Sequence, residues 1–316
     1  MKAIALATAL LTFGAVQAQE ASTVYFTSEI TPESLVKIYK ALGVDAQGNV
    51  AVKISTGESE HSNHLRPEFI APLVKEVNGT LVECNTAYPG NRNTTEKHRQ
   101  AIAERGYDKI AVVDIMDADG SMPLPMQDST YFNDNLVGKH LANYDFMINL
   151  AHFKGHQMGG FGGVLKNQSI GVASSEGKAL IHTAGKTSDP AGLWDNLPEQ
   201  DQFLESMAGA AQTVDTYFKG KKGIVYINVM NNMSVDCDCN GHPEAAKLKD
   251  MGILASLDPV ALDQACLDLV FNHASTEGDD SKPLIQRINR QHGTHIVDYA
   301  EKLGLGTKKY TIVPLD

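Results

Sequence analysis

Apolar strand-like runs alternate with helix-like segments along most of this 316-residue chain. Runs such as 50–56 and 146–152 are typical of strands buried on both faces, and segments with helix start and stop signals stand between them. Strands joined through helices need crossover connections, so they should run parallel within one sheet. The sequence therefore predicts an α/β fold with a mostly parallel sheet and flanking helices.

The first 18 residues follow another pattern. Lys2 precedes an apolar run that ends in Val16-Gln17-Ala18, which is typical of a secretory signal peptide cleaved after Ala18. The run is too short for a comfortable membrane span, and no later segment is apolar enough for one. We expect a periplasmic or secreted chain, with a buried first helix as the alternative. Residues 19–316 would form a single α/β domain or two lobes, 19–170 and 171–316.

Local signals set several element boundaries. Thr31 is an expected N-cap for a helix that stops at Gly43, and Asp258 caps a later helix that begins with proline. Asn93 has capping-box spacing to a glutamate three residues on. The segment 179–184, "ALIHTA", is expected to be a strand.

A formal net charge of −11 lacks the basic field that holds nucleic acid or an anionic membrane surface. We expect a small-molecule ligand and no nucleic acid. The candidate binding loops are those that follow the strands at 50–56, 80–87 and 146–152, because loops at the carboxyl ends of parallel strands meet at one edge of the sheet. Arg66 and Arg92 in these loops are expected to hold an anionic substrate.

The most unusual segment, "HFKGHQMGGFGGVLKN", starts at His152, where the run 146–152 ends, and continues into the following loop. It lacks the spacing of a phosphate-binding or dinucleotide-binding loop. Its side chains suit acid–base or nucleophilic catalysis. The candidate catalytic residues are His152, Lys154, His156 and Lys166. The glycines Gly159, Gly160, Gly162 and Gly163 would let the backbone approach a cofactor. The alternative is a loop whose histidines only satisfy hydrogen bonds.

A second cluster, "DCDCNGH", contains Cys237, Cys239 and His242. These three are expected metal ligands for zinc, copper or iron. A Cys-x-Cys pair in a strand points its side chains to opposite faces, so we do not expect the two to bond to each other. The alternatives are a disulfide from one of them to Cys84, or inert thiols. Cys266 lies in an apolar helical run and is expected in the core.

Three segments together resemble the domain of unknown function 362 family: "NTAYPGNRNTTEKH", "HFKGHQMGGFGGVLKN" and "MGILASLDPVALDQACLDLV". The resemblance covers nearly all of 19–316. Many members carry a ferredoxin-like insert with two Cys-rich cluster motifs after the Gly-rich segment. This chain has no cysteine in "KTSDPAGLWDNLPEQ", so the resemblance does not imply that iron–sulfur role.

A fainter resemblance, from His156 through Lys166 to His182, is to the nickel-pincer lactate racemase family. It implies that Lys166 carries a pyridinium-derived cofactor, that His182 binds nickel and that His156 is an acid–base group. Arg66 would match a substrate-binding arginine. Asn91 stands where that family has a second catalytic histidine, and His98 would be its substitute.

Three functions remain open. The first is an exported small-molecule enzyme or metallocofactor protein that uses the His/Lys/Gly-rich segment and a transition metal such as nickel, iron or zinc. The second is a metal-binding or redox protein centred on the two close cysteines. The third is a non-catalytic periplasmic protein that binds an organic acid. The sequence does not define the oligomeric state.

Overall fold

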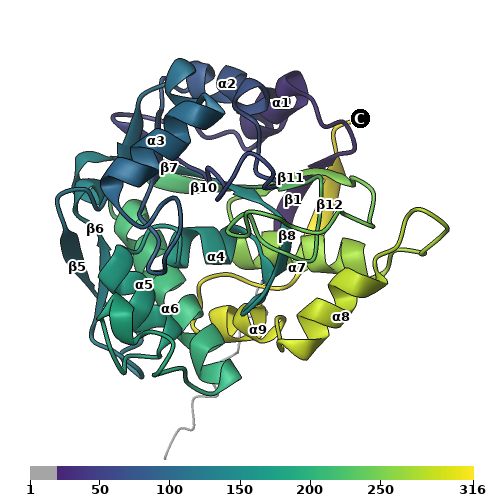
Figure 1. Cartoon of the computed structure of the whole chain (residues 1–316). Helices are drawn as coiled ribbons and strands as arrows, with labels where there is room; N and C mark the ends of the chain where they lie inside the picture. The colour runs from purple at the N-terminus through teal and green to yellow at the C-terminus, as the bar shows by residue number, and fades with distance from the viewer. Residues whose placement is uncertain (1–19) are drawn as a thin grey trace, which may run out of the picture.

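The computed structural model describes residues 20–316, so the predicted signal peptide, 1–18, lies outside the described residues. Eight strands form one sheet in the order β12-β1-β11-β10-β7-β2-β3-β4. β11 is antiparallel to both of its neighbours, and every other neighbouring pair of this sheet is parallel. The predicted α/β fold with a mostly parallel sheet is therefore confirmed (Figure 1). Strands from before and after residue 170 are interleaved in the sheet.

The large sheet contains β1 (Ser22–Thr27), β2 (Val50–Lys53), β3 (Thr80–Glu83), β4 (Val113–Ile115), β7 (Phe146–His152), β10 (Gly223–Met230), β11 (Gly252–Ser256) and β12 (Tyr310–Pro314). Two small antiparallel sheets pair β5 (Ser121–Pro125) with β6 (Asp134–Gly138) and β8 (Lys154–His156) with β9 (Gly160–Gly162). The α-helices are α1 (Pro32–Ala41), α2 (Pro67–Glu76), α3 (Thr95–Arg105), α4 (Val164–Ser169), α5 (Ser175–His182), α6 (Gln200–Lys219), α7 (Pro259–Phe271), α8 (Lys282–Arg290) and α9 (His295–Lys302).

Helices cover both faces of the large sheet (Figure 1). In β7, Phe146, Ile148 and Leu150 join the core that packs against α1 and α2, whereas Met147 and Ala151 join the core under α4, α6 and α7. This alternation follows from the two-residue period of a strand, and it buries β7 on both faces. Among residues 20–316, no helix has the length and apolar character needed to cross a membrane.

Most predicted helix caps are present. The Thr31 side chain caps α1 and the Asp258 side chain caps α7, each accepting hydrogen bonds from backbone N–H groups of the first turn. Asn93 does not cap α3, so that expectation was wrong by one residue. Thr94 is the N-cap, because its hydroxyl oxygen accepts a hydrogen bond from the Lys97 amide at 3.3 Å.

The predicted strand at 179–184 is also wrong, because most of this segment belongs to α5. The Ser174 hydroxyl caps the helix by accepting from the Gly177 amide at 3.1 Å, and Glu176 lies in the first turn, where a negative charge is favourable. The apolar run is the second half of this helix, and a run so short does not distinguish a strand from a helix. His182 is therefore the last residue of a helix.

A buried carboxylate fixes α4 against the sheet. Asp263 of α7 accepts hydrogen bonds from the amides of Val164 and Leu165, each at 3.0 Å, and from Asn228 of β10 at 2.7 Å. Burial raises the pKa of Asp263 to about 6. The carboxylate lies at the N-terminus of α4, where it satisfies free amide groups that the helix leaves unpaired.

Gly163→Ala should destabilise the protein. A Cβ at Gly163 would lie 2.2 Å from Oδ1 of Asp263, which its three hydrogen bonds hold in place. We expect a loss of about 1–3 kcal/mol in the free energy of unfolding, measured in urea. Gly162→Ala is the matched control, because its Cβ would meet only flexible lysine side chains at 3.7 Å and beyond. Equal stability of the two variants would contradict this packing.

Candidate functional site

Loops from the carboxyl ends of four strands enclose a cavity of about 410 Å³. The loop after β2 contributes Ser55 and Glu58, and the loop after β3 contributes residues from Cys84 to Arg92. The segment after β7 contributes Lys154 and residues 156–158, and the loop after β10 contributes 238–241. Helices α4 and α5 complete the wall with Lys166, Lys178 and His182. The three loops singled out from the sequence therefore meet here.

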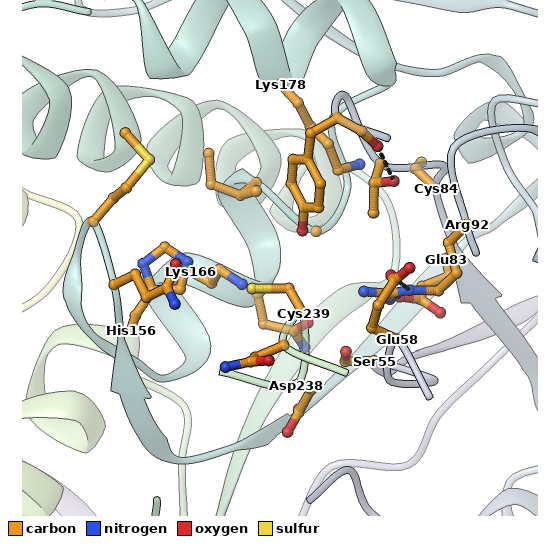
Figure 2. Close-up of a pocket in the computed structure, with 18 of the residues that line it drawn as sticks. Ser55, Glu58, Glu83, Cys84, Arg92, His156, Lys166, Lys178, Asp238 and Cys239 are labelled. Carbon is orange, nitrogen blue, oxygen red and sulfur yellow. Dashed lines mark hydrogen bonds and ion pairs between the residues drawn. The ribbon is translucent and has the colours of Figure 1, made fainter. Parts of the chain in front are cut away.

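Figure 2 shows the titratable side chains that line the cavity, with Lys178 and Asp238 apart from the two groups at its sides. His156 and Lys166 lie on one side, and Glu58, Glu83 and Arg92 lie on the other. The lining contains five basic side chains and three acidic ones: Lys53, Arg92, Lys154, Lys166 and Lys178 against Glu58, Glu83 and Asp238. The cavity is therefore basic, although the chain as a whole carries a net charge of −11.

The Arg92 guanidinium binds two of the acidic groups. It lies 2.7 Å from Glu83 and 3.1 Å from Glu58, and only 3 % of the residue is exposed. Burial opposes the charge on Glu83, but Arg92 and His98 hold its pKa well below the usual range. Arg92 is thus neutralised by protein carboxylates, which corrects the expectation that it holds an anionic substrate.

His98 is fully buried behind this ion pair. Its ring nitrogens lie 3.1 Å from Glu83 and 3.2 Å from the Asn85 side chain, and it is not among the cavity-lining residues. Asn91 is exposed and donates to the backbone oxygen of Glu58. Neither residue reaches the cavity, so the structure does not place them as substrate-binding groups.

Arg66 lies outside the cavity as well. It is exposed at the N-terminus of α2 and contacts His64 at 2.9 Å and the Ser62 carbonyl at 3.2 Å. Its guanidinium bonds to its own loop, and it is not a lining residue. The role in substrate binding expected for Arg66 is therefore not supported by its position.

Asp238 is the second buried centre of charge. Its carboxylate accepts from Lys154 and from His152, each at 2.8 Å. The other ring nitrogen of His152 lies 2.6 Å from the Asn231 carbonyl, so each ring nitrogen faces an acceptor oxygen. His152 and Lys154 therefore tie the loop after β10 to the segment after β7, and neither is free for the catalytic role expected from the sequence.

Three lysines in the cavity lack a carboxylate partner within residues 20–316: Lys53, Lys166 and Lys178. The Lys178 ammonium donates to the Ala173 carbonyl at 2.5 Å. Desolvation lowers the pKa of Lys53 to about 8, against the attraction of Glu83. Neither Lys53 nor Lys178 was predicted as a site residue, although the presence of a lysine within the apolar run 50–56 was a signal for Lys53.

Lys166 projects from α4 into the cavity, and in the part of the chain that is described its ammonium has no hydrogen-bond or ion-pair partner. Desolvation, reinforced by the nearby charge of Lys154, lowers its pKa to about 7. At neutral pH the amine therefore exchanges readily between its charged and neutral forms. Such an amine can attract an anion, transfer a proton or act as a nucleophile.

His156 and His182 have opposite tautomers. The Gly159 amide donates to Nδ1 of His156 at 2.8 Å, which leaves the proton of the neutral ring on Nε2. Nδ1 of His182 lies 2.7 Å from the Lys178 carbonyl and donates to it, which leaves a lone pair on Nε2. Burial lowers both pKa values, that of His182 to about 4, so both rings are neutral near pH 7. One ring offers a donor and the other an acceptor or metal ligand.

The expectation that Cys237 and Cys239 do not bond to each other is wrong. Cys237 and Cys239 form a disulfide with each other, and Cys84 is a free, buried thiol. The segment is not a strand, so its alternate side chains need not point to opposite faces. Cys239 lines the cavity, and His156 lies within 4.8 Å of both sulfurs.

His242 is exposed, and its ring lies beside that of His61, tilted by 30° with 5.8 Å between ring centroids. It is not part of the group of ligand atoms that contains the two sulfurs. The histidine near the cysteines is therefore His156. Cys266 lies in the core, as expected.

The glycines do not line the cavity. A Cβ at Gly160 would lie 2.8 Å from Cα of Gly293, and one at Gly163 would meet Asp263. Close packing against other parts of the chain requires Gly160 and Gly163. None of Gly159, Gly160, Gly162 and Gly163 is a lining residue, so the cofactor contact expected for them is not supported. Gly159 contributes its amide to His156 instead.

The family model "Domain of unknown function (DUF362)" matches residues 50–268. The chain belongs to this family. The matched region contains every side chain of the cavity described above. No curated protein matches the DUF362 chain.

Two solved structures are similar to this chain over part of their length. The lactate racemase apoprotein from Thermoanaerobacterium thermosaccharolyticum is 17 % identical over 65 % of this chain and 50 % of its own, with a TM-score of 0.41. A protein from Thermotoga maritima is 10 % identical over 86 % of this chain and 58 % of its own, with a TM-score of 0.40. The DUF362 chain thus spans about half the length of these two proteins.

Thiol counting tests the cysteine pairing. We expect the unfolded, unreduced chain to expose two thiols and the reduced chain four. Cys84→Ser should lower the unreduced count to one, because Cys266 then remains as the free thiol. If Cys84 were instead bonded to Cys237 or Cys239, the same variant would release its partner and give three. Reaction with a coloured thiol reagent and peptide mapping by mass spectrometry provide the measurement.

Proposed function

We propose that this DUF362 protein is a small-molecule enzyme that binds an organic anion in the cavity and transfers a proton to or from it. One observation carries the proposal: Lys53, Lys166 and Lys178 face the cavity without a carboxylate partner among the described residues, while the other cations are neutralised. Buried ammonium groups without counter-ions are costly, and a bound carboxylate or phosphate would stabilise them.

Proton transfer would use the two neutral histidines, whose tautomers are set by hydrogen bonds to backbone groups, together with Lys166. His182 can accept a proton at Nε2, and the neutral His156 can donate a hydrogen bond from Nε2. Lys166, with a pKa of about 7, can do either near neutral pH. An anion held by the lysines would share the cavity with His182 as a base and Lys166 as an acid or base, which are the groups that proton transfer at a neighbouring carbon requires.

The same residues also fit the metallocofactor that the racemase resemblance implies. Lys166 has a free amine, and the Nδ1–H group of His182 bonds to a carbonyl, as metal-binding histidines commonly do. Such a group would supply metal-centred chemistry, with Lys166 and His182 holding it. Export, indicated by the leader pattern at 1–18, is part of the proposal and would make the protein periplasmic or secreted.

Anion affinity should depend on the charge of Lys166. Its pKa of about 7 means that the ammonium predominates at pH 6 and the neutral amine at pH 8. We expect acetate binding, measured by calorimetry, to weaken by up to roughly tenfold between these pH values. Lys166→Arg should bind with little pH dependence, Lys166→Ala should bind weakly at both, and Lys75→Ala on the exposed face of α2 should match the wild type. Unchanged binding by Lys166→Ala would refute the anion site.

The same proteins separate an enzyme from a plain binder. A mixture of small organic acids is incubated in deuterated water, and carbon-bound deuterium is measured by mass spectrometry. An enzyme should promote exchange in one acid, and His182→Asn should abolish exchange while it retains acetate binding. Acetate binding without exchange in any acid would support the non-catalytic binding protein instead.

A soft metal site is the second candidate, because His156, Cys237 and Cys239 offer ligand atoms within 4.8 Å of one another. The Gly159 amide donates to Nδ1 of His156, so only Nε2 of this ring could bind a metal ion. In the neutral ring Nε2 carries the proton, which would have to leave first, and the metal site is therefore the second candidate. The site also requires the disulfide to be reduced.

If this metal site exists, protein reduced with a phosphine should bind one Zn²⁺ per chain, measured by elemental mass spectrometry after gel filtration. The double variant Cys237→Ser, Cys239→Ser should lose the ion, and Cys84→Ser should retain it, because the Cys84 thiol lies outside the cluster. Reduced wild-type protein without stoichiometric zinc would exclude this candidate.

A further inference from the structure

The cavity wall changes in character from its interior to its mouth. The interior is polar, and Lys53, Lys178 and His182 are each at most 5 % exposed. Apolar side chains with greater exposure also line the cavity: Tyr88, Pro89, Met158 and Trp194. A ligand that fills the cavity would therefore meet both the buried cations and these more exposed apolar side chains.

Trp194 is the exposed aromatic residue of this rim, with 53 % of its surface accessible. Its ring lies beside Tyr88, with 6.4 Å between ring centroids and 47° between ring planes. An exposed indole leaves a large apolar face in water, which is unfavourable unless something covers it. Because Trp194 and Tyr88 both line the cavity, a ligand within it can cover that face.

The loop that carries Trp194 is held in place. The preceding residue, Leu193, is fully buried in a small cluster with Ala87 and Ala179. The Asn196 side chain donates to the Gly192 carbonyl at 2.8 Å, which closes the turn around the indole. Burying Leu193 and exposing Trp194 next to it directs the indole toward the cavity mouth before any ligand arrives.

We propose that the ligand is a planar aromatic organic anion. Its carboxylate or phosphate would lie at the lysines, and its ring would stack against Trp194 and Tyr88. A cavity of about 410 Å³ is within the range of small-molecule sites. This inference rests on the proposed anion site and adds the class of the ligand. It predicts that ring stacking, rather than apolar bulk, determines which anion binds.

The test compares three probe anions: benzoate, cyclohexanecarboxylate and acetate. Calorimetry gives the affinities for the full chain, and fluorescence gives an independent signal because Trp194 is the single tryptophan of the sequence. We expect benzoate to bind about two- to tenfold more tightly than cyclohexanecarboxylate and to change the indole emission. Trp194→Ala should remove this preference without changing acetate affinity, and Trp194→Phe should retain part of it.

Leu197→Ala is the matched control, since Leu197 is an exposed apolar side chain of the same loop that does not line the cavity. It should retain the benzoate preference. Equal affinity for benzoate and cyclohexanecarboxylate would overturn the inference, and so would a benzoate preference that survives Trp194→Ala. In either case, binding of acetate by the wild type would still support the anion site. Failure of the wild type to bind any of the three anions would overturn both.

Discussion

Two buried carboxylates, Glu83 and Asp238, hold together the loops on which the cavity depends. Glu83 ends β3 and binds Arg92 from the loop that follows it. Asp238, after β10, binds Lys154 from the segment that follows β7. Removal of one partner from a buried ion pair typically costs about 3–5 kcal/mol, because the other charge is left without compensation. The loops therefore keep the cavity walls in one arrangement.

These ion pairs also decide which cations remain for a ligand. With Arg92 and Lys154 neutralised, the positive charge of the cavity comes from Lys53, Lys166 and Lys178. Desolvation lowers the pKa values of Lys53 and Lys166 toward neutrality. A bound anion would raise them again, since it favours the charged amines, so anion binding and proton uptake should be linked.

The Gly-rich segment shapes the site through the close packing and the hydrogen bonding of its backbone. A Cβ at Gly155 would lie 2.2 Å from the Val235 carbonyl oxygen, so glycine is needed where this segment passes the loop after β10. The turn that follows brings the Gly159 amide to His156 and fixes its tautomer. The glycines thus position the hydrogen-bond donor of His156 and are not placed to contact a cofactor.

The sequence by itself determined the α/β class, most strands and helices and their caps, because periodicity and capping depend on residues close along the chain. It also singled out His156, Lys166 and His182, which line one cavity. It did not reveal that Arg66 lies elsewhere or that Trp194 lies at the cavity mouth. Whether a cation is neutralised or free depends on contacts between distant residues, such as Lys154 and Asp238, which are 84 positions apart, and only the tertiary structure decides these. The pairing of Cys237 with Cys239 depends on the folded conformation of the segment that carries both, which is not a strand.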